Sequence, residues 1–440
     1  MQTVIGLDFG TTNSAIAVGK DDGSVELALF QDGPSVTKTF RSILYFPAKE
    51  RDSNKQPQVV AGPDAIHSYL DAETKGRLML SIKSYLASRL FTHTQIYGRS
   101  YTIEDLISVI LRKLREVAQL QFGEAVSHVV VGRPVVFSGA EKPEDEQFAL
   151  GRLKAAAEMA GFDNISFEFE PVAAAYHYEK QLDHDELVLI GDFGGGTSDF
   201  SLIRLGPSRR QEGHHQRHIL GTEGLPIAGD TFDSRVMMNM VAPRLGLGSH
   251  YISLGKELNV PVWIYTKLAS WHLMSFLNTP DTMNVLKQVK AQAVEREKVE
   301  ALIHIIKDNL GYKLYRAVEA TKVGLTEQET AGFIFNDAQV EIEESVERWA
   351  FESWLQPDVQ AIAGCVERLM SRCHVTAADV DSVFLTGGSS FVPVVRRFFT
   401  KKFGADRLRS GEELTTVAKG LALCALDRLG DGRRGVYAQS

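Results

Sequence analysis

Uninterrupted apolar runs, each followed by turn residues, mark several strands along this chain. Such runs precede Asp8 and Asp192, fill residues 129–131 and return at residues 383–386. A short apolar run of this kind is typical of a strand that is buried on both faces. Residues 165–169 instead alternate apolar and polar side chains, which predicts a half-buried strand.

Segments with helical spacing of their apolar residues separate these strands. Residues 75–91 and 102–120 have this spacing, residues 147–160 form an Ala-rich segment, and residues 234–325 are mostly helical in pattern. Further short strands are expected at residues 14–18 and 25–30, as hairpin partners of the first apolar run. Because strands alternate with helices, the pattern predicts an α/β protein.

One short pattern occurs twice, far apart in the chain: an apolar run, then Asp-Phe-Gly, then a turn of Gly and Thr. The first turn contains Gly10, Thr11, Thr12 and Asn13, and the second contains Gly194, Gly195, Gly196 and Thr197. Glycine lets backbone N–H groups approach an anion closely, and threonine hydroxyls add donors. The wide spacing favours a repeated domain over a short tandem repeat. Two such turns facing each other would bind a polyphosphate, so the repeat predicts a nucleotide site.

A third Gly-rich turn joins the strand at 383–386 to a predicted helix that begins at Pro393. It contains Gly387, Gly388 and Ser389. A helix N-terminus preceded by glycine can contact an anion or a nucleoside. Three turns of this kind after strands favour ligand binding over three unrelated structural turns.

Composition and charge exclude other classes of protein. The 440 residues leave room for two or three domains, and the formal charge of −8 argues against a general nucleic-acid binder. No apolar stretch reaches membrane-spanning length, and the first residues lead directly into a strand, so a cytoplasmic protein without a membrane partner is expected. The three cysteines are widely spaced and form neither a disulfide framework nor a zinc pattern.

Several charged residues suit the hydrolysis of a phosphoanhydride, which requires charge neutralisation, positioning and an oriented water. Asp8, Asp192 and Asp199 could hold Mg²⁺, mostly through water. Glu170 could orient the attacking water, or it could be a charge that complements a helix N-terminus. Lys83 could reach a γ-phosphate, or it could be a solvated helix residue.

Five segments resemble DnaK-type heat-shock 70 kDa chaperones. In the family's order they are the first phosphate loop (residues 5–14), the Glu-Pro-Thr-Ala-Ala-Ala segment (170–175), the second phosphate loop (192–199), the Gly-Gly-Glu-Asp-Phe-Asp segment (228–235) and the adenosine loop (385–390). The long helical region near residues 249–315 and the early end of the chain resemble the YegD subgroup.

The resemblance implies an actin-like ATPase fold, in which two ribonuclease-H-like lobes enclose a central nucleotide cleft. It places Lys83, Glu170 and Asp199 at catalytic positions, with Asp8, Asp192 and Asp199 around Mg²⁺. The implied contacts of ATP or ADP are Gly10, Thr11, Thr12, Asn13, Gly194, Gly195, Gly196, Thr197, Gly229, Glu319, Lys322, Thr326, Gly387, Gly388, Ser389 and Phe391.

The resemblance also implies the domain organisation. Lobe I comprises residues 1–188 and is completed by a C-terminal helix at 412–430, whereas lobe II comprises residues 189–411 with a helical insert at about 235–325. Residues 431–440 are expected to be a flexible tail. The family's interdomain linker and peptide-binding domain are not expected, and neither is peptide clamping of the usual kind.

Two positions depart from the family pattern. Val323 and Phe391 stand where the family places two arginines that sandwich adenine. Guanidinium stacking is therefore lost, although the ring of Phe391 could still stack on a base. The departure concerns affinity and base selectivity more than phosphate binding.

The leading hypothesis is a monomeric, chaperone-like protein that binds ATP and hydrolyses it slowly. Its lobes are expected to close around Mg·ATP and to regulate a protein partner, with the helical insert as a candidate surface for that partner. Two alternatives on the same fold remain: a small-molecule kinase and a polymerising relative of actin.

Overall fold

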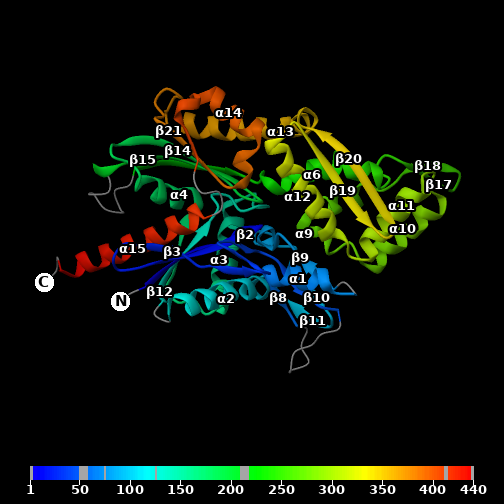
Figure 1. Cartoon of the computed structure of the whole chain (residues 1–440), viewed down its shortest axis with the longest axis horizontal. Coiled ribbons are helices and arrows are strands. Elements are labelled where there is room, and N and C mark those ends of the chain that lie inside the picture. The colour runs from blue at the N-terminus through cyan, green and yellow to red at the C-terminus, as the bar shows by residue number, and fades with distance from the viewer. Residues whose placement is uncertain are drawn as a thin grey trace.

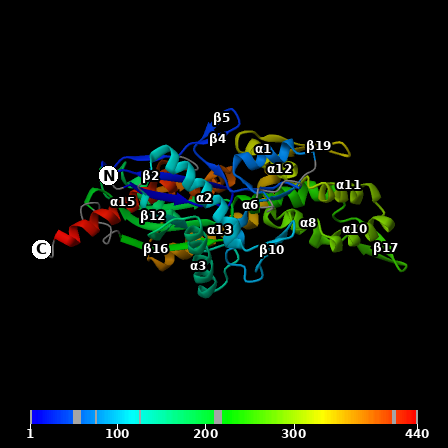
Figure 2. The same ribbon diagram turned by 90° about the horizontal axis from the view of Figure 1, so that it is seen from below.

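The structure, a computed structural model, describes residues 3–48, 58–73, 76–123, 126–208, 218–410 and 415–437. The fold is mixed α/β, which confirms the predicted class. Two sheets lie one above the other near the chain ends, and a mostly helical region extends away from them (Figure 1). Seen from below, this helical region forms the end of the molecule opposite the N- and C-termini (Figure 2).

The first sheet combines an antiparallel meander with two parallel strands. Its strands in spatial order are β13 (Ile165–Phe169), β12 (Val126–Arg133), β1 (Thr3–Asp8), β2 (Asn13–Gly19) and β3 (Val25–Leu27). β12 runs parallel to β1 and β13, whereas β2 is antiparallel to β1 and β3. A short strand, β6 (Phe40–Arg41), pairs with the start of β2.

The second sheet repeats this topology. Its strands in spatial order are β16 (His218–Leu225), β15 (Ser198–Leu205), β14 (Glu186–Phe193), β21 (Ser382–Thr386) and β22 (Leu408–Ser410). β14 to β16 form the meander, and β21 and β22 follow parallel to β14. The repeated sequence pattern therefore corresponds to a repeated sheet, with β1 equivalent to β14.

Two helices, α4 (Glu170–Glu179) and α15 (Thr416–Tyr437), pack against each other between the sheets (Figure 1). α4 packs on β14 and β15, and α15 packs on β1 and β2. Glycines permit the close approach: a Cβ at Gly420 would lie 1.7 Å from the carbonyl oxygen of Ala173. The C-terminal helix predicted at 412–430 begins at Thr416 and continues to Tyr437, so it extends into the segment predicted to be a tail.

The first half of the chain contains further elements outside the first sheet. They are β4 (Phe30–Asp32), β5 (Ser35–Thr37), β7 (Leu44–Phe46), β8 (Val60–Ala61), α1 (Pro63–Asp71), β9 (Arg77–Met79), the 3₁₀ turn η1 (Ile82–Tyr85), β10 (Thr94–Ile96), β11 (Arg99–Tyr101), α2 (Ile103–Phe122) and α3 (Pro143–Met159). The helices predicted at 102–120 and 147–160 are confirmed as α2 and α3. The strand predicted at 25–30 is divided between β3 and β4.

The helix predicted at residues 75–91 is wrong. β9 occupies this segment and pairs with β7, and η1 follows it. Ser81, between them, has a φ of 50°, which a right-handed helix does not allow. The apolar residues Leu78 and Met79 are buried by this pairing, which the local spacing cannot distinguish from a helix face.

The helical region predicted at residues 234–325 is largely confirmed. It comprises α6 (Gly229–Val236), the π turn η3 (Met237–Val241), α7 (Ala242–Arg244), α8 (Val262–Leu268), α9 (Trp271–Met274), α10 (Pro280–Gln292), α11 (Arg296–Lys307) and α12 (Gly311–Glu327). A hairpin of β17 (His250–Ser253) and β18 (Lys256–Asn259) interrupts it, and the prediction missed this hairpin.

The chain returns from the helical region to the second sheet. This part contains β19 (Thr330–Asp337), β20 (Val340–Glu347), α13 (Arg348–Arg372), the 3₁₀ turn η4 (Gly388–Phe391), α14 (Pro393–Phe403) and the 3₁₀ turn η5 (Ala405–Arg407). Across the described ranges, no helix combines the length and the apolar character needed to cross a bilayer.

Candidate functional site

A cavity of about 770 Å³ is lined by all three Gly-rich turns, the start of α6 and residues of α12. It contains nearly every residue that the sequence predicted for the site. Those that line it are Asp8, Gly10, Thr11, Thr12, Asn13, Lys83, Glu170, Asp192, Gly194, Gly195, Gly196, Thr197, Gly229, Glu319, Lys322, Thr326, Gly387, Gly388, Ser389 and Phe391. Asp199 is buried beside the cavity and does not line it.

The first two turns face each other at direct contact. A Cβ at Gly195 would lie 2.4 Å from Thr12 Oγ1, and one at Gly196 would lie 3.0 Å from Thr11 Oγ1. A larger side chain at Gly195 would therefore meet the opposite turn. The backbone amides and threonine hydroxyls of two equivalent hairpins are thus brought to one place, as the repeat predicted.

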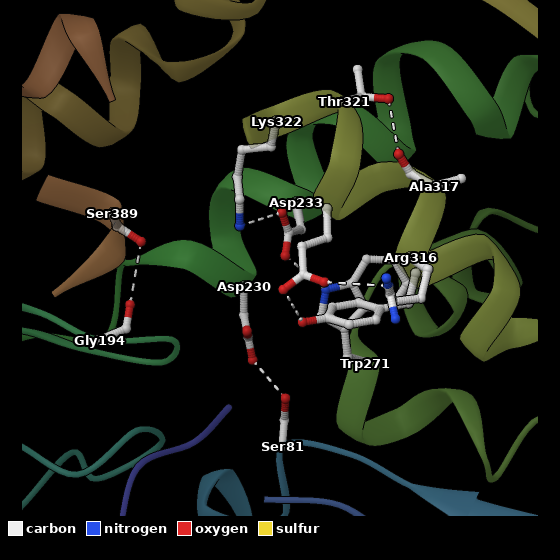
Figure 3. Close-up of polar contacts among 12 residues, drawn as sticks. Ser81, Gly194, Asp230, Asp233, Trp271, Arg316, Ala317, Thr321, Lys322 and Ser389 are labelled. Atoms are coloured by element: carbon white, nitrogen blue, oxygen red, sulfur yellow. Dashed lines mark hydrogen bonds and ion pairs between the residues drawn. The ribbon is translucent and has the colours of Figure 1, made fainter. Parts of the chain in front are cut away.

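Hydrogen bonds from other elements fix the second turn. The amides of Gly229 and Asp230, at the start of α6, donate to the carbonyl oxygens of Gly194 (3.3 Å) and Gly195 (2.7 Å). The hydroxyl of Ser389, in the third turn, also donates to Gly194 O at 3.3 Å (Figure 3). The three segments that the sequence singled out separately are therefore one connected structure.

Carboxylates stand next to the first two turns; Asp192 and Asp199 are buried, and Asp8 is half-buried. Asp192 and Asp199 are direct partners in the pairing of β14 with β15, whereas Asp8 has Ala15 opposite it in the first hairpin. Burial, followed by repulsion from Glu170, raises the pKa of Asp8 and of Asp199 to about 7. Burial raises the pKa of Asp192 well above its usual value, and the neighbouring carboxylates add to this effect.

These carboxylates suit a cation held through water. Within the described residues, Asp199 Oδ2 is buried without a hydrogen-bond partner, so the group has capacity for a further donor or a hydrated ion. Among the residues that the structure describes, no three or more His, Cys, Asp or Glu side chains lie close enough together to ligate a metal directly. The prediction that Asp8, Asp192 and Asp199 hold Mg²⁺ through water is compatible with both observations.

Lys83 and Glu170 form a buried ion pair. Lys83 Nζ lies 2.7 Å from Glu170 Oε1, and each side chain is 8% exposed. Burial alone would lower the pKa of Lys83, but the charges of Glu170 and Asp8 outweigh it and raise the pKa. The alternative of a solvated helix lysine is therefore wrong, because Lys83 lies in η1 and points into the site. Glu170 does begin α4, and its carboxylate faces Lys83.

Two residues of α12 that line the cavity, Lys322 and Glu319, form ion pairs with residues of other elements. Lys322 Nζ lies 2.6 Å from Asp233 Oδ1 in α6 (Figure 3), and Glu319 Oε1 lies 3.1 Å from Arg41 Nη1 in β6. Sequence reasoning assigned no site role to Arg41, Asp230 or Asp233, all of which line the cavity. Asp230 and Asp233 lie in the segment 228–235 already singled out, whereas nothing local marks Arg41, whose partner is 278 residues away.

The end of the cavity next to η4 is aromatic and apolar. Phe391 and Val323 line it, and the guanidinium of Arg396 lies 5.7 Å from the centroid of the Phe391 ring. Arg396 also lines the cavity, although no sequence motif singles it out. This end therefore presents one ring face and one guanidinium, in a cation–π arrangement.

Comparison with known proteins identifies the family. A family model described as Hsp70 protein matches residues 4–243 and 287–431. The chain is 26% identical over 425 residues to the chaperone protein DnaK of Thermosipho africanus, an alignment that covers 96% of this chain and 58% of that protein. It is 26% identical over 436 residues to the chaperone protein DnaK of Thermotoga petrophila, covering 98% of this chain and 61% of that protein.

The chain thus spans about three fifths of the length of the curated relatives that it matches. The predicted subgroup is compatible with these matches and stays a prediction. Membership of the matched family implies the actin-like ATPase fold that the sequence predicted, and the mixed α/β structure agrees with it. The family model covers most of the chain on both sides of residues 244–286, and the chain belongs to the Hsp70 family.

Proposed function

We propose that this chain binds ATP or ADP with Mg²⁺ in the cavity and hydrolyses ATP slowly, as a chaperone-like protein. The observation that carries the proposal is the direct contact of two equivalent Gly-Thr turns next to buried carboxylates. A polyphosphate in the cavity, where the two turns meet, would accept hydrogen bonds from both. The relatives named chaperone protein DnaK support the chaperone-like class.

Each part of the cavity then has a distinct role. Lys83, already charged beside Glu170, would hold the terminal phosphate, and Glu170 would orient the attacking water. Asp8, Asp192 and Asp199 would hold the hydrated Mg²⁺. When bound, the ion would supply charge neutralisation on the phosphates. Glu319, Lys322 and Thr326 of α12 would contact the nucleoside.

The base would stack on the ring of Phe391. Val323 adds apolar surface, and the guanidinium of Arg396, which also lines the cavity, lies 5.7 Å from the centroid of the ring. Such a site contacts the π-face of a base more than its edge, so we expect weak discrimination between ATP and GTP.

We also propose two working lobes. The predicted lobe I comprises residues 1–188 with α15, and the predicted lobe II comprises residues 189–411; because β14 of the second sheet begins at Glu186, the boundary between the lobes is better placed before that residue. Their closure around Mg·ATP would bring Arg41 of β6 and Glu319 of α12 together, as they are in the ion pair of this structure. A protein partner at the helical insert stays a prediction; Ile252, Leu254 and Leu258 of its hairpin are exposed apolar residues that such a partner could cover.

Calorimetric titration with ATP, ADP and GTP, with and without Mg²⁺, tests the proposal. Wild-type protein should bind all three, and more tightly with Mg²⁺. Gly195→Val should abolish binding, because the new side chain would meet Thr12. Gly332→Val is the matched control, because Gly332 is exposed in β19, lies outside the cavity and has no atom within 4 Å of an added Cβ. Wild-type protein that binds none of these nucleotides would refute the proposal.

The same preparation separates the two alternatives. A kinase should transfer phosphate to a member of a panel of sugars and carboxylates, and turnover should rise with that metabolite. A polymerising protein should scatter light on addition of Mg·ATP. Slow hydrolysis that no metabolite stimulates, in a protein that stays monomeric, supports the leading proposal.

A further inference from the structure

The segment outside the family match, residues 244–286, contributes a buried side chain next to the nucleotide cavity. α9 lies in this segment, and its first residue, Trp271, is 1% exposed. Trp271 packs behind α6 and α12, between two residues that contact the α12 side chains in the cavity.

The first contact is with the partner of Lys322. Trp271 Nε1 donates to Asp233 Oδ2 at 3.3 Å, and the other oxygen of Asp233 holds Lys322 Nζ at 2.6 Å (Figure 3). Asp233 is 1% exposed, so water cannot readily take the place of the indole N–H if that donor is lost. The indole N–H therefore helps to fix the carboxylate that positions the Lys322 ammonium.

The second contact is with the neighbour of Glu319. The indole ring of Trp271 packs edge-on against Tyr315, with ring centroids 5.0 Å apart. The hydroxyl of Tyr315 donates to Glu319 Oε1 at 3.3 Å. One indole thus supports two of the α12 residues that line the cavity, Lys322 and Glu319.

The charges of Asp233 and Lys322 make this ion pair sensitive to loss of the indole N–H. Burial raises the pKa of Asp233, and Lys322 opposes that rise. Burial would lower the pKa of Lys322, but Asp233 and Glu319 outweigh it and raise the pKa. The two charges stabilise each other, and the hydrogen bond from Trp271 favours the ionised carboxylate.

α9 also contacts the phosphate side of the site. The hydroxyl of Tyr85, the last residue of η1, donates to the carbonyl oxygen of His272 at 2.9 Å. η1 carries Lys83. The segment that the family model leaves unmatched therefore contacts elements on both sides of the cavity.

We propose that Trp271 is a positioning residue for the nucleoside end of the site, acting through Asp233 on Lys322 and through Tyr315 on Glu319. The segment 244–286 would then be part of the binding apparatus in this chain. The inference rests on the proposed nucleotide binding.

Calorimetry with Mg·ATP and with Mg·tripolyphosphate, on the full chain, tests the inference. Tripolyphosphate has the phosphates without the nucleoside. Trp271→Phe removes the N–H and keeps an aromatic ring; it should weaken ATP binding about tenfold and change tripolyphosphate binding less than about twofold. Trp263→Phe, at a 40% exposed position in α8, is the matched control and should change neither. Lys322→Ala should weaken ATP binding similarly, with little further loss in the double variant.

A second measurement leaves Trp271 in place and so does not depend on the folding of its variant. With the other three tryptophans replaced by Phe, ATP should shift the emission of Trp271, whereas tripolyphosphate should not. Three results would overturn the inference. They are an equal loss of affinity for ATP and tripolyphosphate in Trp271→Phe, an unchanged affinity of that variant for ATP, and a Trp271 emission that does not respond to ATP. If wild-type protein binds tripolyphosphate but not ATP, this inference and the proposed nucleoside site are refuted, whereas the phosphate site stands. If it binds neither ligand, the proposed function as a whole is refuted.

Discussion

At the scale of single residues, buried charge dominates the site. Lys83 and Glu170 are paired at 2.7 Å, and three aspartates lie close by, two of them with pKa values raised to about 7. Keeping these charges buried costs folding free energy, and a bound cation such as hydrated Mg²⁺ would offset the repulsion among the carboxylates. The most informative substitutions therefore remove one charge at a time.

Lys83→Ala should lower the single-turnover rate of ATP hydrolysis by about 10²–10³-fold, because it removes a cation positioned for the terminal phosphate. It also leaves Glu170 buried without its partner, at a cost of about 3–5 kcal/mol in the free energy of unfolding. The double variant with Glu170→Gln should recover part of this stability and stay inactive. Equal rates for wild type and Lys83→Ala would remove Lys83 from the mechanism.

Asp230 gives the nucleotide-free protein a measurable pH dependence. Burial, followed by repulsion from Asp233, raises its pKa from 3.8 to about 7, although Ser81 donates to it at 2.9 Å (Figure 3). A raised carboxyl pKa stabilises the fold at pH below about 4, and this contribution is lost as the pH rises through 7. In urea unfolding, the free energy of unfolding of the wild type should therefore decrease from pH 5 to pH 8. In Asp230→Asn this decrease should be smaller, by about 2–4 kcal/mol at most. Parallel pH profiles would contradict the assignment.

At the scale of elements, the contact between α4 and α15 holds the two sheets together. Gly420 leaves no room for a side chain, since a Cβ there would lie 1.7 Å from the backbone oxygen of Ala173. Gly420→Ala should therefore lower the free energy of unfolding by about 2–4 kcal/mol, measured by urea unfolding. The control is Gly151→Ala, an open position within α3, which should stabilise the protein by about 0.5–1 kcal/mol. Similar effects of the two substitutions would show that α15 is loosely packed.

At the scale of the whole molecule, the ion pair of Arg41 with Glu319 joins β6 of the first half to α12 of the helical region. Both side chains are partly buried, at 28% and 20% exposure, so the pair should be worth about 1 kcal/mol. Arg41→Ala should speed the release of a fluorescent ADP analogue by about three- to fivefold in stopped-flow experiments. Lys20→Ala, which breaks the exposed pair with Glu26, should leave release unchanged. Equal release rates in all three proteins would show that Arg41 does not retain the nucleotide.

The sequence by itself determined the turns and most of the helices, because both depend on residues that are close along the chain. The Asp-Phe-Gly pattern before a Gly-Thr turn marked two hairpins, and the structure gives them the same topology. The site residues that it named line one cavity, apart from Asp199, which lies beside it. Where local spacing suited two structures equally, as at residues 75–91, pairing of β9 with β7 decided the outcome.

Only the tertiary structure decided which distant side chains share the site. Arg41 meets Glu319, Asp233 meets Lys322, and Trp271 reaches Asp233 from a segment that the family model does not match. No periodicity marks such partners, because ion pairs and buried hydrogen bonds depend on distance in space and on the exclusion of water. Local pattern therefore set the elements and the phosphate turns, whereas packing set the charges and the hydrogen bonds around them.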